Sequence, residues 1–333
     1  MPIPDRSLRI TIVGASSPRG KELRDVLEEH SYSSAKFRLF DEDIAVGTLT
    51  RSGDEPAIIE AVDEESFAGA NLVFFAGRAE MAARHAQQAL AAGATVIDLS
   101  EDPGLEDAVA WIPALDAIVG RPQGIERGLL RSPSAAAIVA ASVAAAFDSF
   151  RPARLVMVFL RPVSERGQEG IDELEQQTVK LLSFQPVSEG VFDAQVAFNL
   201  LDAYGPEGEP SLDAVRRTVA RDVGRVLGGK VALPAMQVLQ APVFFSYGFT
   251  AYVDLDPAVE TAQIEAALAA AGLDVATTGE PRPTSMNVTG RPQAALGQVA
   301  RDAGQAGGYW LWGAADNVRL VAVNAVAMAE ACA

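Results

Sequence analysis

Short apolar runs alternate with helix-like segments along the first third of the chain. The runs with strand character are rich in β-branched or aromatic residues and cover residues 9–13, 37–40, 72–75 and 95–99. Leu23, Val26 and Leu27 mark one face of a helix after the first run. Residues 79–92 are helix formers throughout, and Gly93 is the expected C-cap. Repeated alternation of strand and helix predicts a doubly wound parallel sheet, hence the α/β class.

After residue 133 the pattern changes to longer strands and helices. The expected helices cover residues 135–147, 171–181, 212–226 and 320–333, and the expected strands cover residues 154–160, 242–255 and 309–312. Residues 205–210 and 279–292 are rich in Gly and Pro, which predicts loops. This part of the chain therefore predicts a second unit that mixes strands and helices.

The composition is that of a globular protein with two domains. The 333 residues are 49% hydrophobic and 21% charged. Lys and Arg number 27 against 44 Asp and Glu, and a surface with a net charge of −17 repels nucleic acid and anionic membranes. One Cys and two His exclude a disulfide framework and predict no metal site. Because we find no signal peptide and no apolar run that could span a bilayer, we expect a soluble cytoplasmic protein.

A glycine turn follows the first strand, with Gly14 and Gly20 at its ends. Glycines let a backbone approach a pyrophosphate, and the N–H groups at the start of the next helix hold it. The middle position that is often glycine is Ser17, and Pro18 after it has no N–H to donate. Two interpretations stay open: a dinucleotide site, or a structural turn with Pro18 as the first residue of an ordinary helix.

An acidic run, residues 41–43, follows the second strand. Asp41 stands where a carboxylate would hydrogen-bond a ribose hydroxyl, and the same acids would repel a 2′-phosphate. We therefore expect NAD rather than NADP if a nicotinamide cofactor binds at all, and the alternative is a solvated acidic turn. The candidate cofactor contacts are Gly14, Ser16, Ser17, Gly20 and Asp41.

Several stretches together resemble a known family. They cover residues 12–15, 96–100, 163–178, 196–199, 240–245, 315–319 and 324–326. On these stretches the chain resembles the aspartate-semialdehyde dehydrogenase family nearly end to end, and it looks most similar to the USG-1-like branch, which shares the fold but lacks catalytic residues. The resemblance implies a Rossmann-type domain at residues 1–132, completed by a C-terminal helix at 318–333. It also implies an α+β dimerisation domain at residues 133–317, the former catalytic domain, and hence a homodimer.

The family's chemistry needs a cysteine thiolate that attacks the aldehyde while hydride leaves to NADP. That cysteine follows an Asn-Pro-Asn turn, which by the resemblance matches residues 132–134, so the nucleophile position holds Ala135. The family's base is a His, and Tyr247 takes its place. The chain's single thiol, Cys332, stands next to the C-terminus instead. The resemblance therefore leaves no catalytic residue to assign.

The family's binding positions differ as well. Gln240 replaces the Arg that binds the substrate carboxylate, Arg161 replaces a Gln that orients the intermediate, and Gln168 replaces a Lys. Phe249 falls where the substrate-binding Glu would be, and the phosphate-binding Arg is absent from residues 101–107, which carry four acids. Losing one donor from a working site typically costs roughly 10²–10³ in rate. These coupled losses predict a protein that is inactive in semialdehyde chemistry.

Two hypotheses follow. The first is a catalytically degenerate family member that acts as a homodimeric scaffold or regulator, or as a heterodimer with an active paralogue, and requires no cofactor. The second is a NAD(P)-dependent oxidoreductase that works on another aldehyde or oxo substrate without a covalent thioester, with Tyr247 as proton donor. In either case Arg161, Arg166, Gln240 and Tyr247 are candidates to line a remodelled pocket for an acidic metabolite.

Overall fold

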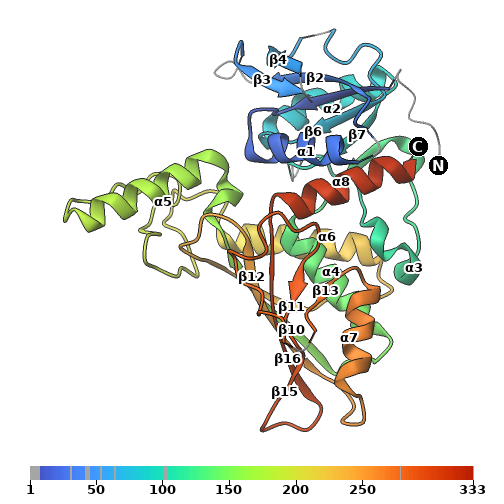
Figure 1. The fold of residues 1–333 in the computed structure, drawn as a ribbon, viewed down its shortest axis with the longest axis vertical. Helices are drawn as coiled ribbons and strands as arrows, with labels where there is room; N and C mark the ends of the chain where they lie inside the picture. Colours follow the sequence, from blue (N-terminus) through green and yellow to red (C-terminus); the bar gives the residue numbers. More distant parts are fainter. Residues whose placement is uncertain are drawn as a thin grey trace. The chain divides into compact units, whose positions relative to one another are not determined.

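The computed structural model describes residues 8–30, 32–41, 46–52, 55–63, 65–100, 104–277 and 279–332 (Figure 1). The chain forms two compact units. The first unit comprises residues 1–113, 121–134 and 321–333, and the second comprises residues 114–120 and 135–320. The last helix therefore returns the chain to the unit in which it began.

The first unit is built on a seven-stranded sheet in which every strand pair is parallel. In spatial order the strands are β5 (Glu60–Ala61), β2 (Lys36–Asp41), β1 (Arg9–Val13), β6 (Leu72–Phe75), β7 (Thr95–Asp98), β9 (Leu129–Arg131) and β8 (Val109–Ala110). From β1 the chain builds the sheet first toward β2 and then, on the other side, toward β6, and this reversal is the switch point of a doubly wound sheet. The predicted doubly wound parallel sheet is confirmed.

The strands of this sheet read as continuous apolar runs because helices cover both faces of such sheets. All four residues of β6 are buried, as are four of the five residues of β1. The larger helices are α1 (Pro18–Glu29), α2 (Ala79–Ala91) and α8 (Arg319–Cys332). The shorter elements of this unit are the hairpin of β3 (Leu49–Ser52) and β4 (Glu55–Ile58) and the 3₁₀ turn η2 (Ile125–Arg127). The 3₁₀ turn η1 (Pro113–Leu115) leads into helix α3 (Asp116–Val119), which belongs to the second unit.

The second unit contains a mixed sheet. In spatial order its strands are β11 (Ala235–Gln240), β10 (Arg154–Arg161), β12 (Tyr247–Asp254), β16 (Gly308–Ala315), β14 (Ala295–Leu296) and β13 (Asp274–Val275), and β15 (Ala300–Arg301) pairs with β16. Strand β10 runs parallel to β11 and antiparallel to β12. The predicted second, mixed unit is therefore confirmed.

Helices cover one face of the mixed sheet, and side chains on its other face stay partly exposed. Helix α4 (Ala135–Asp148) is buried on all sides from its first residue to Phe147, and it packs against α6 (Leu212–Leu227) and α7 (Thr261–Ala270). Along β10 and β12 buried residues alternate with half-exposed ones, as expected for a sheet with one covered face. We call the half-exposed side the open face. It carries Val156, Val158, Leu160, Thr250, Tyr252, Trp310 and Trp312.

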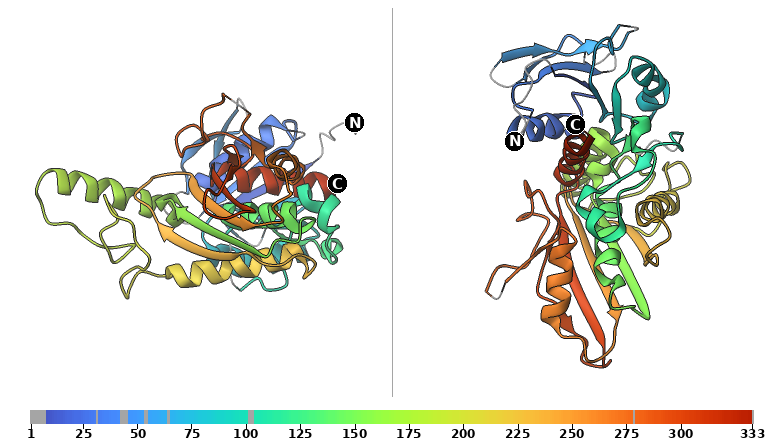
Figure 2. Two further views of the ribbon diagram at one scale, coloured as in Figure 1. Left: turned by 90° about the horizontal axis from the view of Figure 1, so that it is seen from below. Right: turned by 90° about the vertical axis from the view of Figure 1, so that its right-hand side faces the viewer.

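Helix α5 (Gly167–Leu182), which follows the 3₁₀ turn η3 (Val163–Arg166), extends away from the mixed sheet (Figures 1 and 2). It has its own small core, in which Leu174 packs with Phe192 and Val196 of the following loop. The buried carboxylate of Glu173 accepts hydrogen bonds from the N–H groups of Gly190 and Val191. This helix and its loop form a subdomain held by local contacts.

The expected strand over residues 242–255 was wrong in its first half. Strand β12 begins only at Tyr247. Pro242 has no N–H for a strand ladder, and Ser246 has a left-handed φ of +71°, which no regular strand accommodates. The apolar residues Val243, Phe244 and Phe245 thus belong to a link between two strands. Their β propensity was overridden by the backbone on either side.

Candidate functional site

The glycine turn after β1 is built by close backbone contacts. Gly14 has a φ of +85°, and a Cβ atom there would lie 2.2 Å from the backbone nitrogen of Gly77. A Cβ atom on Gly20 would lie 2.2 Å from the carbonyl oxygen of Gly14. Both positions therefore require glycine for the turn to pack at all, whether or not a ligand binds.

Ser17 is the N-cap of α1, and Pro18 occupies its first turn. The Ser17 hydroxyl accepts a hydrogen bond from the Gly20 N–H and donates one to the carbonyl oxygen of Ala76, both at 2.9 Å. These are the contacts of an ordinary capped helix. The structural interpretation of the turn thus accounts for the hydrogen bonds of Ser17 without a ligand.

Asp41 lies at the end of β2 and contacts the turn directly. Its Oδ2 accepts a hydrogen bond of 2.7 Å from the backbone N–H of Ser16. Sequence reasoning expected this carboxylate to bind a ribose, whereas in the structure it holds the turn. The two acids that follow, residues 42–43, lie outside the described residues.

Ala135, which the family resemblance matches to the nucleophile position, lies at the junction of the turn 132–134 and α4. Ala135 is the first residue of α4 and is fully buried. The Ser132 hydroxyl donates to the carbonyl oxygen of Val321 at 3.0 Å and accepts from Asn324 Nδ2 at 3.0 Å. The Cys332 thiol lies on α8, where burial raises its pKa. A thiol with a raised pKa is a poor nucleophile.

Two predicted pocket residues, Arg161 and Gln240, share one hydrogen-bond chain in the second unit. Arg161 ends β10, and its Nη1 donates to the Tyr204 hydroxyl at 3.1 Å. That hydroxyl in turn donates to Oε1 of Gln240 at 2.6 Å. Gln240 Nε2 donates to the carbonyl oxygens of Arg161 and Ala241, so its amide is fully used inside the protein. Gln240, which replaces the expected carboxylate-binding Arg, therefore ties strands β10 and β11 together.

Arg166 lies close enough to Arg161 for the charges to interact. Burial lowers the pKa of Arg166, and the neighbouring charge of Arg161 lowers it further. Its Nη2 donates to the carbonyl oxygen of Val191 at 2.9 Å, and its guanidinium lies 6.0 Å from the ring centre of Phe192. Two guanidinium groups thus lie near one another among the predicted pocket residues, with the carboxylates of Glu169 and Glu173 near enough to offset part of their repulsion.

Tyr247 is 1% exposed at the start of β12. Its ring meets Phe159 edge to face, with ring centres 6.1 Å apart. Phe249, on the same strand, also packs against Phe159, with ring centres 6.0 Å apart. Aromatic packing thus occupies the place where the family resemblance put a base and a substrate-binding acid.

Sequence reasoning missed Asn317, which is 1% exposed and connects three segments. Its Oδ1 accepts from the Ser246 N–H at 2.9 Å, and its Nδ2 donates to Glu165 Oε1 at 2.7 Å and to the Ser164 hydroxyl at 3.1 Å. The buried Ser246 hydroxyl has no hydrogen-bond partner among the described atoms. The motif at residues 315–319 contained Asn317, but no pattern in the sequence joined it to residues 164–165.

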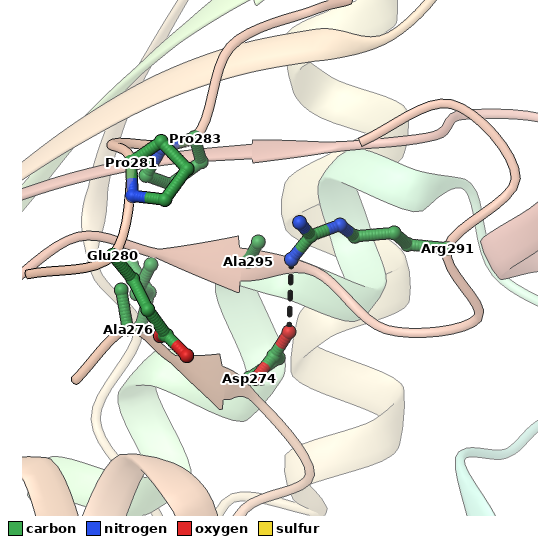
Figure 3. Close-up of a pocket in the computed structure, with 8 residues that line it drawn as sticks. Asp274, Ala276, Glu280, Pro281, Pro283, Arg291 and Ala295 are labelled. Carbon is green, nitrogen blue, oxygen red and sulfur yellow. Dashed lines mark hydrogen bonds and ion pairs between the residues drawn. The ribbon is translucent and has the colours of Figure 1, made fainter. Parts of the chain in front are cut away.

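The acidic stretch is described only in part. Residues 101–103 lie outside the described residues, and Glu106 and Asp107 are exposed. A cavity of about 170 Å³ lies elsewhere, beside β13 and β14, where the guanidinium of Arg291 meets the carboxylate of Asp274 at 3.2 Å (Figure 3). Known ligand pockets measure about 300–1,000 Å³, and none of the predicted pocket residues lines this one.

Within the described parts of the chain, no group of three His, Cys, Asp or Glu residues is arranged to hold a metal ion. Across the same residues, none of the helices has the length and apolar character needed to cross a bilayer.

Comparison with known proteins covers almost the whole chain. Residues 9–131 match the semialdehyde dehydrogenase NAD binding domain, and residues 143–320 match the semialdehyde dehydrogenase dimerisation domain. A USG-1 protein homolog of Pseudomonas aeruginosa is 31% identical over 330 residues, with 97% of each chain covered. An aspartate-semialdehyde dehydrogenase of a Shewanella species is 25% identical, with 98% of this chain and 97% of the relative covered.

Solved structures of similar proteins have the same fold as this chain. A probable aspartate-semialdehyde dehydrogenase from Pseudomonas aeruginosa superimposes with a TM-score of 0.85 at 29% identity, covering 97% of this chain and 98% of its own. Aspartate semialdehyde dehydrogenase II from Vibrio cholerae shares the fold with the same TM-score at 23% identity, with 97% of each chain covered. With both of its domain models matched, this chain belongs to the aspartate-semialdehyde dehydrogenase family.

Proposed function

We propose that this chain is a catalytically degenerate member of its family that acts as a homodimeric scaffold or regulator rather than as a dehydrogenase. The observation that carries the proposal is Ala135. It begins α4 and is fully buried. A methyl group cannot form the covalent acyl intermediate on which the family's chemistry depends.

Two further positions that the family resemblance marks support the same proposal. Tyr247 is packed edge to face against Phe159, and Gln240 has both ends of its amide engaged by protein groups. Neither side chain is placed to take a proton from a nucleophile or to clamp a carboxylate. Since catalytic groups that act as a unit fail together, restoring one of them would not restore turnover.

The alternative is a reductase that uses Tyr247 as proton donor without a thioester. A general acid must lie within hydrogen-bond reach of its substrate. Tyr247 is 1% exposed and surrounded by Phe159 and Phe249, so the phenol has little access to a substrate. We therefore favour the non-catalytic proposal.

The open face supports assembly with a second copy. In register across the sheet, Val158, Thr250 and Trp312 form one row, and Val156, Tyr252 and Trp310 form the next. Trp310 and Trp312 remain 45% and 39% exposed. A largely apolar sheet face of this kind packs well against another sheet face. Because the matched dimerisation domain contains these strands, we propose a homodimer through this face, and the same face would serve a heterodimer with an active paralogue.

A repair series tests the proposal. We expect the wild-type protein and the A135C variant to show no oxidation of aspartate semialdehyde with NAD or NADP above a blank. A variant that combines A135C with Y247H and Q240R restores the nucleophile, the base and the carboxylate clamp. Because the substrate-binding Glu and the phosphate-binding Arg of the family stay absent, we expect this variant to remain at the blank rate as well. Turnover by the wild-type protein would refute the proposal, and turnover by A135C alone would show that the rest of the site is intact.

A further inference from the structure

We infer that the nucleotide-binding edge of the first unit is closed by the protein's own groups and takes up neither NAD nor NADP. The inference deepens the proposed function, on which it rests, because it concerns the cofactor that the matched NAD binding domain implies. It is carried by the contacts of one turn and of one arginine.

The place in question is set by the topology. In doubly wound sheets a dinucleotide binds outside the carboxyl ends of the strands at the switch point, which in this sheet lies between β1 and β6. Its pyrophosphate is held by backbone N–H groups of the turn after the first strand and of the helix that follows. Whether those N–H groups are available decides whether the cofactor fits.

Six N–H groups of this turn and of the start of α1 already have acceptors in the protein. The N–H groups of Gly14 and Ala15 donate to the carbonyl oxygen of Phe40, at 2.9 and 3.1 Å. The Ser16 N–H donates to Asp41 Oδ2 at 2.7 Å, and the Ser17 N–H donates to the carbonyl oxygen of Gly14 at 3.1 Å. The Gly20 N–H donates to the Ser17 hydroxyl at 2.9 Å, and the Lys21 N–H donates to the carbonyl oxygen of Ser17 at 3.0 Å. Pro18 has no N–H. A pyrophosphate would have to displace these acceptors.

One of the displaced acceptors is itself an anion. The Asp41 carboxylate sits on the Ser16 N–H, where it already provides the negative charge that such a turn favours. A phosphate brought to the same turn would meet that carboxylate at close range, and like charges repel. Asp41 therefore acts as an internal substitute for a ligand anion.

The side chain of Arg19 lies across the carboxyl ends of the strands, where the nucleotide would bind. It lies in the first turn of α1, next to β1, and its Nη1 donates to the carbonyl oxygen of Leu99 at 2.9 Å. Leu99 directly follows β7, and β6 lies between β1 and β7 in the sheet. Ser17, two residues before Arg19, contacts the carbonyl oxygen of Ala76 directly after β6, so the arginine side chain reaches from the carboxyl end of β6 to that of β7. It occupies the space through which a dinucleotide would pass.

The test is direct binding of NAD and NADP, measured by calorimetry without any turnover. Wild-type protein is expected to show no saturable binding up to about 1 mM, an affinity near −4 kcal/mol. The S17G/P18A/R19V variant removes the cap, the proline and the spanning arginine, and we expect it to bind NAD at least about tenfold more tightly than wild type. The matched control is R24V, which removes another arginine from α1, one that contacts Thr50 rather than the turn.

Two results would overturn the inference. One is saturable binding of NAD or NADP by the wild-type protein below about 1 mM. The other is a folded triple variant that binds no better than wild type. We expect the triple variant to fold, since Gly replaces an N-cap Ser with little loss of stability. If it does not fold, a second measurement on the wild-type protein still tests the inference. Amide exchange at residues 14–21 of the wild-type protein should not change when either nucleotide is added, and slower exchange would also overturn the inference.

This test separates the inference from the proposed function. A wild-type protein that binds NAD but turns over no aldehyde would overturn the closed edge and leave the non-catalytic proposal standing. A protein that turned over aldehyde would overturn the proposed function whatever the binding isotherm showed.

Discussion

Phe184 holds a left-handed backbone angle that favours glycine, with a φ of +54°, and its side chain is 99% exposed. It follows α5, whose end is closed by hydrogen bonds from the Phe184 N–H to the carbonyl oxygen of Leu181 and from the Gln185 N–H to that of Lys180. This is the Schellman pattern, in which glycine is the usual residue. An aromatic side chain there costs backbone strain and gains no packing within the chain.

We therefore expect Phe184→Gly to stabilise the protein by about 1 kcal/mol. The measurement is the free energy of unfolding in urea. Phe184→Ala is the matched control, since it removes the ring and keeps the strained backbone, and it should leave stability nearly unchanged. Equal stabilisation by both variants would mean that the ring rather than the backbone angle is the source of strain.

Tyr32 offers a test with a defined pH range. Burial, together with the charges of Glu330 and Cys332, raises its pKa to about 12. Between pH 10 and about 12 the unfolded chain loses the phenol proton while the folded chain keeps it, so stability must fall as pH rises. We expect a loss of about 1–2 kcal/mol, measured by urea unfolding across this range. Tyr32→Phe should lose less over the same range, and an identical loss would contradict the assignment.

At the scale of elements, the loop after α5 depends on one buried carboxylate. Glu173 is 7% exposed, and it accepts hydrogen bonds from Gln177 Nε2 and from the N–H groups of Gly190 and Val191. Glu173→Ala leaves the N–H groups of Gly190 and Val191 without this acceptor, and we expect a loss of about 2–3 kcal/mol. Glu175→Ala, on an exposed position of the same helix, is the control and should change stability by less than about 0.5 kcal/mol. Similar losses in both variants would rule out a specific role for Glu173.

The elements themselves were largely predictable from the sequence. Apolar runs located β1, β6 and β7, and helical spacing located α5 and α6, because packing on one core fixes these periods. The strand over residues 242–255 was wrong because Pro242 and the backbone angle of Ser246 override local propensity. The hairpin of β3 and β4 was missed because its exposed residues carry no periodic signal.

The candidate site was predictable only where a local motif marked it. The turn from Gly14 to Gly20 follows a recognisable strand, so its position could be read from the sequence. The hydrogen bonds between Arg161, Tyr204 and Gln240 could not be predicted from the sequence, because each joins residues more than thirty positions apart. The contact between Arg19 and Leu99 spans eighty positions and depends on strand order, which the sequence pattern leaves open.

At the scale of the whole molecule, the proposed function requires that two copies of the chain form a dimer through the open face. Val158 lies in the middle of the open face, on β10, beside Thr250 of β12. We expect Val158→Glu to weaken a dimer by about 3 kcal/mol, roughly 100-fold in Kd, because it buries an unpaired charge. Sedimentation velocity measures the effect, and Leu49→Glu, at a 71% exposed apolar position of the first unit, is the control. A dimer that survives Val158→Glu would place the interface elsewhere.

The most direct measurement is the steady-state rate of the purified wild-type protein with aspartate semialdehyde, phosphate and either nicotinamide nucleotide. Because our proposal assigns the methyl group of Ala135 to the nucleophile position, we expect the rate to equal that of a blank prepared from cells lacking the gene. The A135S variant, prepared alongside, should give the same blank rate, since an unactivated hydroxyl adds no usable nucleophile. A wild-type rate that rises in proportion to enzyme concentration and saturates with the aldehyde would contradict the account.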